Sequence, residues 1–209
     1  SSNYTTYAFR GNGTLLWSYS AGYFNSNVAV GDLGNDGTLE VVFVGHDGGI
    51  WYVFALRATG GTLVWRSHMS PFPFFFDPGN VALADLDNDG QLEVVTINPR
   101  SGVVVFRHDG TLYWSGPASL ANFNCYFCSS RNPNSPTIAD LNGDGFKEIV
   151  IGCYNQRTVY ALRGTDGSIL WSYGNVATCS QNSGRKIGDI DGDGALEVVL
   201  TSYHTGWGT

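Results

Sequence analysis

Four short acidic segments hold the residues of this chain whose types and spacing could do chemistry. They read DLGNDGTLE at 32–40, DLDNDGQLE at 85–93, DLNGDGFKE at 140–148 and DIDGDGALE at 189–197. In three of them carboxylate or amide side chains stand at positions 1, 3, 5 and 9, and Gly stands at position 6. Calcium takes six to eight oxygen ligands at about 2.3–2.6 Å, and a backbone carbonyl at position 7 can add to these side chains. The pattern therefore predicts oxygen-lined cation sites.

The residue types in the loops favour calcium over other common ions. None of the four segments contains His or Cys, which disfavours zinc and copper, and magnesium sites are less often built from so many protein oxygens. Without a cation, neighbouring carboxylates would repel one another by on the order of 1 kcal/mol per pair. Ordinary Asx turns would explain one such loop but not three. We therefore expect three calcium sites, whose removal loosens the fold.

The segment at 32–40 departs from the pattern. Gly34 stands where the third-position ligand belongs, which leaves Asp32, Asp36, Glu40 and the carbonyl of Thr38. We expect this fourth site to be weak, completed by water or empty.

The residues around the acidic loops predict the elements that position them. A short segment of apolar and small residues precedes each loop, as at 28–31, and a continuous apolar run follows it, as at 41–44, which is typical of a strand covered on both faces. The rest of each unit is an apolar strand, a Gly-containing turn and a strand that ends in Trp. The four copies of this residue are Trp17, Trp65, Trp114 and Trp171. Each unit is thus predicted to be a four-stranded meander.

The acidic loops begin at residues 32, 85, 140 and 189, so successive copies are 53, 55 and 49 residues apart. A repeat of this length, built only of strands, predicts an all-β chain that forms a β-propeller of four four-stranded blades in a single domain over 1–209. The repeats cover about 28–68, 81–115, 136–173, and 185–203 completed by 5–18.

The sequence leaves three possibilities for the way in which such a ring closes. The chain starts with an outer strand pair and ends with an inner pair, so pairing of the N-terminal outer strands with the C-terminal inner strands would remove the open sheet edges. The chain can instead be part of a seven- or eight-bladed propeller, or its ends can pair between neighbouring molecules in a head-to-tail chain.

Charge and cysteine content limit the classes of partner and compartment. A net charge of -7 with only 11 Lys and Arg argues against nucleic acid, and no apolar run is long enough for direct membrane insertion. The four cysteines, an even number, predict disulfides in an oxidising compartment with three possible pairings. They are Cys125, Cys128, Cys153 and Cys179. We expect an extracellular or cell-surface location, with redox or metal chemistry at 125–128 as the alternative.

The acidic repeats resemble the FG-GAP and VCBS repeats of integrin α-subunit propellers and their bacterial relatives. The resemblance implies that each loop joins the first and second strands of a blade and holds structural calcium. The implied ligands are Asp85, Asp87, Asp89, Gln91 by its carbonyl and Glu93; Asp140, Asn142, Asp144, Phe146 by its carbonyl and Glu148; and Asp189, Asp191, Asp193, Ala195 by its carbonyl and Glu197. The outer half of each unit, as in TDGSILW at 165–171, is similar to the tail of quinoprotein dehydrogenase blades, which implies that the Trp packs blade against blade.

Long aromatic loops on the opposite face are the candidate partner site. Their exposed rings could contact a protein, a second copy or a glycan, although they could also simply plug the ring. The candidates are Phe72, Phe74, Phe75, Phe76, Phe123, Tyr126 and Phe127. Scattered histidines and the lack of a nucleophile motif predict no catalytic residue. The sequence thus favours an extracellular binding, adhesion or self-assembly module, such as a surface or filament subunit. The alternatives are a lectin and a polysaccharide lyase-type enzyme.

Overall fold

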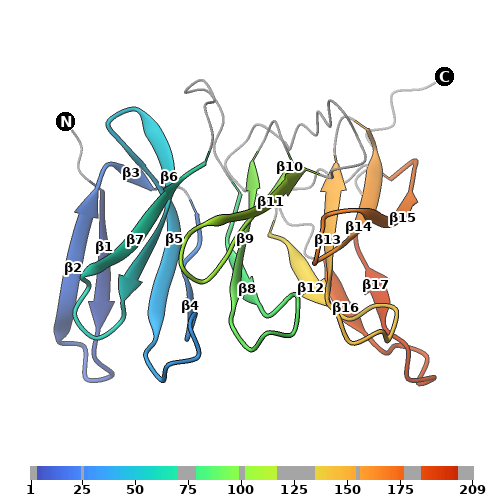
Figure 1. Cartoon of the computed structure of the whole chain (residues 1–209), viewed down its shortest axis with the longest axis horizontal. Helices are drawn as coiled ribbons and strands as arrows, with labels where there is room; N and C mark the ends of the chain where they lie inside the picture. Colours follow the sequence, from blue (N-terminus) through green and yellow to red (C-terminus); the bar gives the residue numbers. More distant parts are fainter. Residues whose placement is uncertain are drawn as a thin grey trace.

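The computed structural model describes residues 4–24, 26–69, 79–98, 102–116, 135–153, 156–176 and 185–201. Within these ranges the chain forms strands β1 to β17 and no helix (Figure 1). The search of this described part for a helix long and apolar enough to cross a membrane finds none. The all-β class predicted from the sequence is confirmed.

Three antiparallel sheets are complete four-stranded meanders. The first contains β4 (Ala29–Gly31), β5 (Glu40–Asp47), β6 (Ile50–Arg57) and β7 (Leu63–His68), and the short β3 (Tyr23–Phe24) also pairs with β5. The second contains β8 (Ala82–Ala84), β9 (Glu93–Asn98), β10 (Gly102–Phe106) and β11 (Leu112–Gly116). The third contains β12 (Thr137–Ala139), β13 (Glu148–Cys153), β14 (Thr158–Arg163) and β15 (Ile169–Tyr173). The predicted meanders are therefore present.

Two further sheets contain only two strands each. β1 (Tyr4–Phe9) pairs with β2 (Leu15–Ala21) near the N-terminus, and β16 (Lys186–Gly188) pairs with β17 (Glu197–Val199) near the C-terminus. They lie at opposite ends of the row of sheets in Figure 1.

The sheets stand side by side in chain order, as blades of a propeller do. Every residue of β9 and of β13 is buried, because a neighbouring sheet covers each face of these strands. The first strands are in contact in sequence, β4 with β8, β8 with β12 and β12 with β16. The sheets therefore converge along their first strands, which gives a propeller-like arrangement.

A tryptophan within each of the outer strands β2, β7 and β11 joins one sheet to the next. Each of these strands continues past its tryptophan, so the expectation that the strand ends there is wrong. The indole N–H of Trp17 donates to the Ala58 carbonyl at 2.6 Å, and that of Trp65 donates to the His108 carbonyl at 2.8 Å. The indole N–H of Trp114 donates to the Gly164 carbonyl at 2.7 Å. The blade-against-blade packing implied by the resemblance is confirmed for these three residues.

Each of these indole rings lies over a turn glycine of the next sheet. A Cβ at Gly61, Gly110 or Gly167 would come within 2.6–2.7 Å of a ring atom of Trp17, Trp65 or Trp114. These glycines also have φ angles of 67°, 84° and 70°, which residues with a side chain rarely adopt. The turn therefore needs glycine for two separate reasons.

The predicted closure within one chain is not seen. Among the described residues, β1 pairs only with β2 and β17 only with β16. The structure thus shows an open row of sheets, and the number of blades in a closed ring stays a prediction.

Candidate metal centre

Each acidic loop joins the first and second strands of a sheet, as the resemblance implied. The loop at 85–93 leaves β8 and ends at Glu93, the first residue of β9. Its tight path needs a positive φ at two positions, 61° at Asn88 and 87° at Gly90. The sixth-position glycine was predicted from the pattern. The positive φ at the fourth position was missed, although Asn or Gly stands there in all four loops and both residues tolerate it.

Backbone amides hold one oxygen of two carboxylates in the 85–93 loop, Asp85 and Glu93. The Leu86 N–H donates to Glu93 Oε2 at 2.9 Å and the Gly90 N–H donates to Asp85 Oδ2 at 3.1 Å. These bonds fix the carboxylate planes and therefore orient the second oxygen of each group.

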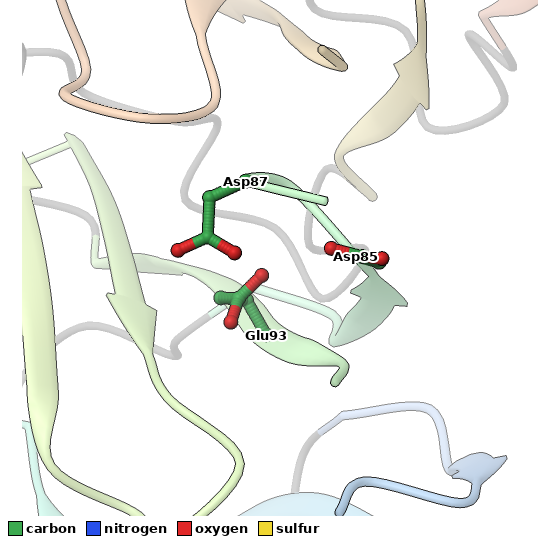
Figure 2. Close-up of side chains that lie close together, drawn as sticks. All are labelled: Asp85, Asp87 and Glu93. Carbon is green, nitrogen blue, oxygen red and sulfur yellow. The ribbon is translucent and has the colours of Figure 1, made fainter. Parts of the chain in front are cut away.

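The second oxygens of this loop are buried without a partner. Asp85 Oδ1, Asp87 Oδ1 and Glu93 Oε1 are buried and accept no hydrogen bond from any described residue. The three carboxylates offer oxygens that lie within 4.8 Å of one another, and Figure 2 shows Asp87 and Asp85 grouped around Glu93. A buried carboxylate oxygen without a donor is strongly unfavourable unless a cation compensates it. This donor set, made only of hard oxygens, fits calcium.

Burial also changes the acidity of this site. Loss of solvent raises the pKa of Glu93 to about 7, and the charges of Asp87, Asp89 and Asp85 add to the rise. The Arg107 guanidinium lies 3.6 Å from Asp87 Oδ2, the oxygen that is not orphaned. The negative charge of the inner oxygens is therefore left for a bound cation to neutralise.

The loop at 189–197 brings together the second cluster of this kind in the described part of the chain. Oxygens of Asp189, Asp191 and Glu197 lie within 4.8 Å of one another. The backbone bonds repeat those of the 85–93 loop, because the Ile190 N–H donates to Glu197 Oε2 at 2.8 Å and the Gly194 N–H donates to Asp189 Oδ2 at 3.0 Å. Asp189 and Asp191 are exposed here, since β16 and β17 lack outer strands.

The loop at 140–148 keeps the backbone geometry and has Asn142 at the third position, where the loops at 85–93 and 189–197 have aspartate. The Leu141 N–H donates to Glu148 Oε2 at 2.9 Å, as in the other loops. The Asn142 side-chain amide donates to Asp144 Oδ2 at 2.9 Å, and the carboxylates of this loop form no three-residue group. Burial raises the pKa of Glu148. Ligation of a cation by the predicted residues of this loop stays a prediction.

In the loop at 32–40 an arginine side chain occupies the place that a metal ion would take beside the carboxylates. Arg57 Nη1 donates to Glu40 Oε1 at 2.6 Å and lies 4.0 Å from Asp36 Oδ2. Thr38 donates to Asp36 through both its hydroxyl and its N–H, and the hydroxyl bond in particular lowers the pKa of Asp36. A guanidinium thus satisfies the glutamate oxygen that is orphaned in the 85–93 loop. The weakness of a fourth cation site in this loop stays a prediction.

The sequence analysis missed this arginine, although its signal is present. Arg10, Arg57, Arg107 and Arg163 occupy equivalent positions, since the N–H of each donates to a carbonyl across the same turn at 2.8 Å. Arg57 and Arg163 lie directly opposite Glu40 and Glu148 in their sheets. The repeated arginine therefore belongs to the surroundings of the acidic loops at 32–40, 85–93 and 140–148.

Other predicted site residues are less fully placed by the structure. The N–H groups of Thr38, Gln91, Phe146 and Ala195 donate to the fifth-position carboxylates Asp36, Asp89, Asp144 and Asp193. Ligation by their carbonyls stays a prediction. Cys153 is disulfide-bonded, whereas Cys125, Cys128 and Cys179 lie outside the described residues. The aromatic candidates also lie outside them, namely Phe72, Phe74, Phe75, Phe76, Phe123, Tyr126 and Phe127.

Comparison with solved structures supports the propeller-like arrangement. BamB from Moraxella catarrhalis aligns with 94% of this chain at a TM-score of 0.58 and 14% identity. The rhamnogalacturonan lyase PL11 of Bacillus licheniformis covers 92% at 0.56 and 20% identity, and the exotype rhamnogalacturonan lyase YesX covers 93% at 0.59 and 16% identity. The chain spans only 49%, 41% and 40% of these proteins, respectively. At such identities the likeness concerns the fold alone.

Comparison of sequences identifies the repeats themselves. No curated protein sequence matches the chain. The profile of the FG-GAP-like repeat, however, matches three times, over residues 35–96, 85–151 and 140–200. Each match starts within or at an acidic loop and ends after the next one, and together they cover most of the chain. This chain therefore belongs to the family of proteins built from FG-GAP-like repeats.

Proposed function

We propose that this chain is an extracellular propeller-like module that is held rigid by calcium and used for binding, adhesion or assembly. The observation that carries the proposal is the set of three buried, unpartnered oxygens of Asp85, Asp87 and Glu93. A cation that binds only the folded loop stabilises it by about 2.7 kcal/mol at a concentration one hundred times its dissociation constant.

Contacts between neighbouring loops would spread this stabilisation through the row of sheets. The Asn88 side-chain amide donates to the Gly145 carbonyl at 2.7 Å, and Lys147 Nζ donates to the Asp85 carbonyl at 2.9 Å. Ordering of the 85–93 loop by calcium would therefore also fix the 140–148 loop of the next sheet.

The proposed sites differ in strength for reasons visible in each loop. The loops at 85–93 and 189–197 would bind calcium through their acidic clusters. The loop at 140–148 would be a third site, in which Asn142 must turn its amide oxygen to the ion. The loop at 32–40 would bind weakly or not at all, because Arg57 already neutralises Glu40.

An extracellular location fits both the metal and the cysteine chemistry. Calcium-binding modules outside the cell work with dissociation constants of roughly 0.1–1 mM. Disulfides persist in oxidising compartments, and Cys153 is disulfide-bonded. We assign no catalytic residue, since the likeness to the two lyases is one of fold at 20% and 16% identity.

Thermal unfolding with and without calcium tests the proposal. The melting temperature should rise by several degrees in about 1 mM CaCl2, fall back with EDTA and respond much less to MgCl2. Asp87→Asn should remove most of the rise. Asp109→Asn is the matched control, because Asp109 caps a turn outside the acidic loops through Thr111. Identical melting curves in calcium and EDTA would refute the structural role of calcium.

A further inference from the structure

The hairpin of β1 and β2 is the outer half of a blade. Its register shifts between Ala8 and Phe9, and the outer pairs of the three complete sheets shift at the equivalent points, for example between Ala55 and Leu56. Trp17 of β2 docks onto the next sheet just as Trp65 and Trp114 do. The hairpin thus has the geometry of a third and fourth strand, and among the described residues no first and second strand pairs with it.

This missing half leaves an apolar residue of β1 uncovered. Phe9 is 62% exposed. Its equivalents in the complete sheets, Leu56, Phe106 and Leu162, are 0–2% exposed because a second strand and a neighbouring sheet cover them. Exposed large apolar residues at an open sheet edge mark a surface that binds another strand.

The pair of β16 and β17 lacks the opposite half. Val199 is 47% exposed, whereas its equivalents Val42, Val95 and Val150 are fully buried. Ile190, in the adjoining acidic loop, is 62% exposed, whereas Leu33 at the equivalent position is 2% exposed. These side chains belong to a first and second strand beside which the described residues place no third strand and no further sheet.

Trp171 and Gly13 are the two unmatched members of the docking pattern. Trp171 follows Trp17, Trp65 and Trp114 in the repeat but is 36% exposed. Gly13 has a φ of 83°, as the docked turn glycines do, yet no described heavy atom lies within 4 Å of the place where its Cβ would stand. Within the described part of the chain, Trp171, near the C-terminal end, thus has no turn glycine beneath its indole ring. The turn at Gly13, near the N-terminal end, has no indole ring over it among the described residues.

An apolar cavity lies where the missing outer strands would pack. Its volume is about 410 Å³, and it lies between the last complete sheet and β17. The side chains that line it include Leu141, Val159, Trp171, Tyr173, Val198 and Leu200. A third and fourth strand added beside β17 would fill this space.

We propose that the β1–β2 hairpin of a second copy of this chain docks beside β17 and Trp171, so that two molecules together complete a four-stranded blade. This deepens the proposed assembly role and rests on it. In the completed blade, Arg10 of one copy lies opposite Glu197 of the other, as Arg57 lies opposite Glu40 within one chain. The Trp171 indole N–H donates to the Gly11 carbonyl, and its ring covers Gly13.

The arrangement of the described sheets favours a second copy over the chain's own N-terminus. β1 and β17 lie at opposite ends of the longest axis of the molecule (Figure 1). To meet within one chain, β1 and β17 would require the angles between neighbouring sheets to change. Those angles are fixed by the contacts of Trp17, Trp65 and Trp114 with the next sheet, each with an indole hydrogen bond of 2.6–2.8 Å. Head-to-tail docking between copies leaves these contacts intact. Such an interface either closes a ring of copies or extends into a polymer.

Disulfide trapping between variants that each carry one added cysteine tests the occupant and the register. The proposed register places Thr6 opposite Thr201, because Val53 lies opposite Val44 in the first sheet. When Thr6→Cys protein is mixed with Thr201→Cys protein under mild oxidation, a covalent dimer should form that can only join two molecules. Thr5→Cys mixed with Thr201→Cys is the out-of-register control, since neighbouring residues of a strand point to opposite faces. Failure of the in-register pair to cross-link overturns the proposal. So does a cross-link that forms only within single molecules of a Thr6→Cys/Thr201→Cys double variant and never between the two mixed proteins.

Sedimentation over a range of concentrations measures the same contact without added cysteines. The chain should associate, and Trp171→Ala should weaken the association by at least about 10-fold, since buried Trp dominates interface energies. Leu112→Ala is the control, because Leu112 is 59% exposed on β11, away from both ends. A wild-type chain that stays monomeric at all concentrations overturns the proposal. If calcium still raises the melting temperature of that monomer, the calcium-stabilised module stands and only the docking fails.

Discussion

Asp85 and Glu93 each use one carboxylate oxygen to order the loop backbone and keep the other oxygen buried without a partner. The same division occurs at Glu40, but there Arg57 donates to the second oxygen. In two loops of similar sequence the buried charge of the ninth-position glutamate is therefore compensated differently. Arg57 pairs with Glu40, whereas the second oxygen of Glu93 is left for a bound cation.

Replacement of these two glutamates should have opposite effects in metal-free protein. Glu93→Gln removes a desolvated charge and keeps an acceptor for the Leu86 N–H, so the free energy of unfolding in EDTA should rise by about 1–3 kcal/mol at pH 8. Glu40→Gln, the matched control, should lower it, because Arg57 loses its buried partner. Urea unfolding measures both. A loss of metal-free stability in Glu93→Gln would mean that this glutamate is not strained without an ion.

The pH dependence of calcium stabilisation should follow Glu93. Its pKa in the folded, metal-free protein is about 7, above the ordinary value of 4.5, so the folded state binds the proton more tightly than the unfolded state. The stability that this proton contributes is complete below about pH 4.5 and is lost as the pH rises through 7. Calcium needs the ionised carboxylate and removes the penalty of ionisation. The difference in melting temperature between calcium and EDTA should therefore grow from pH 5 to pH 8.

Glu93→Gln is the control for this pH profile and should flatten it. A calcium effect as large at pH 5 as at pH 8 would contradict the assignment of Glu93 as a ligand.

The residue pattern predicted which side chains meet in the acidic loops at 85–93 and 189–197. It predicted only part of their geometry. Positions 1, 3 and 9 come together in the loops at 85–93 and 189–197. The fifth-position carboxylates, such as Asp89, instead accept bonds from the position 7 N–H and stand outside the three-residue clusters. The role of Arg57 could not be predicted from the loop, because the arginine is contributed by a strand that pairs with the loop's end only in the folded sheet.

Among the elements, the outer strand that carries a tryptophan is the feature that joins sheets. The sequence pattern showed its repetition, and the blade-tail resemblance implied its packing. The acceptors, such as the Ala58 and His108 carbonyls, lie in the next repeat and are found only from the packed structure. The register shift repeated in every outer pair was also not predicted, since the residues around it, such as Ala55 and Leu56, read as an ordinary apolar strand.

A pair of glycine substitutions measures how much the close contact between Trp65 and the turn at Gly110 contributes to stability. Gly110→Ala and Gly13→Ala impose the same left-handed strain, at φ angles of 84° and 83°, but only the Cβ at Gly110 would meet Trp65, at 2.7 Å. Gly110→Ala should therefore lower the free energy of unfolding by about 1–3 kcal/mol more than Gly13→Ala does. Urea unfolding in calcium, at a concentration low enough to keep the chain monomeric, measures the difference. Equal losses in the two variants would show that the indole contact adds nothing.

At the scale of the whole molecule, the sequence predicted the blades and not how they close. The number of half-blades follows from the repeats, and the structure contains each of them. The angle between neighbouring blades depends on the packing of side chains between sheets, such as Val44, Val53 and Phe106 in one core cluster, and no repeat pattern encodes it. The open ends of the row of sheets are therefore evident only in the structure, where the side chains of Phe9 and Val199 are exposed to solvent.

A crystal structure grown in calcium, with anomalous diffraction data, tests the central claim most directly. The account predicts an anomalous peak at about 2.3–2.6 Å from Asp85 Oδ1, Asp87 Oδ1 and Glu93 Oε1, and a second peak among Asp189, Asp191 and Glu197. The loop at 32–40 should show a much weaker peak or none, with Arg57 still bound to Glu40. Clear density for the 85–93 loop without an ion between its three oxygens would contradict the account.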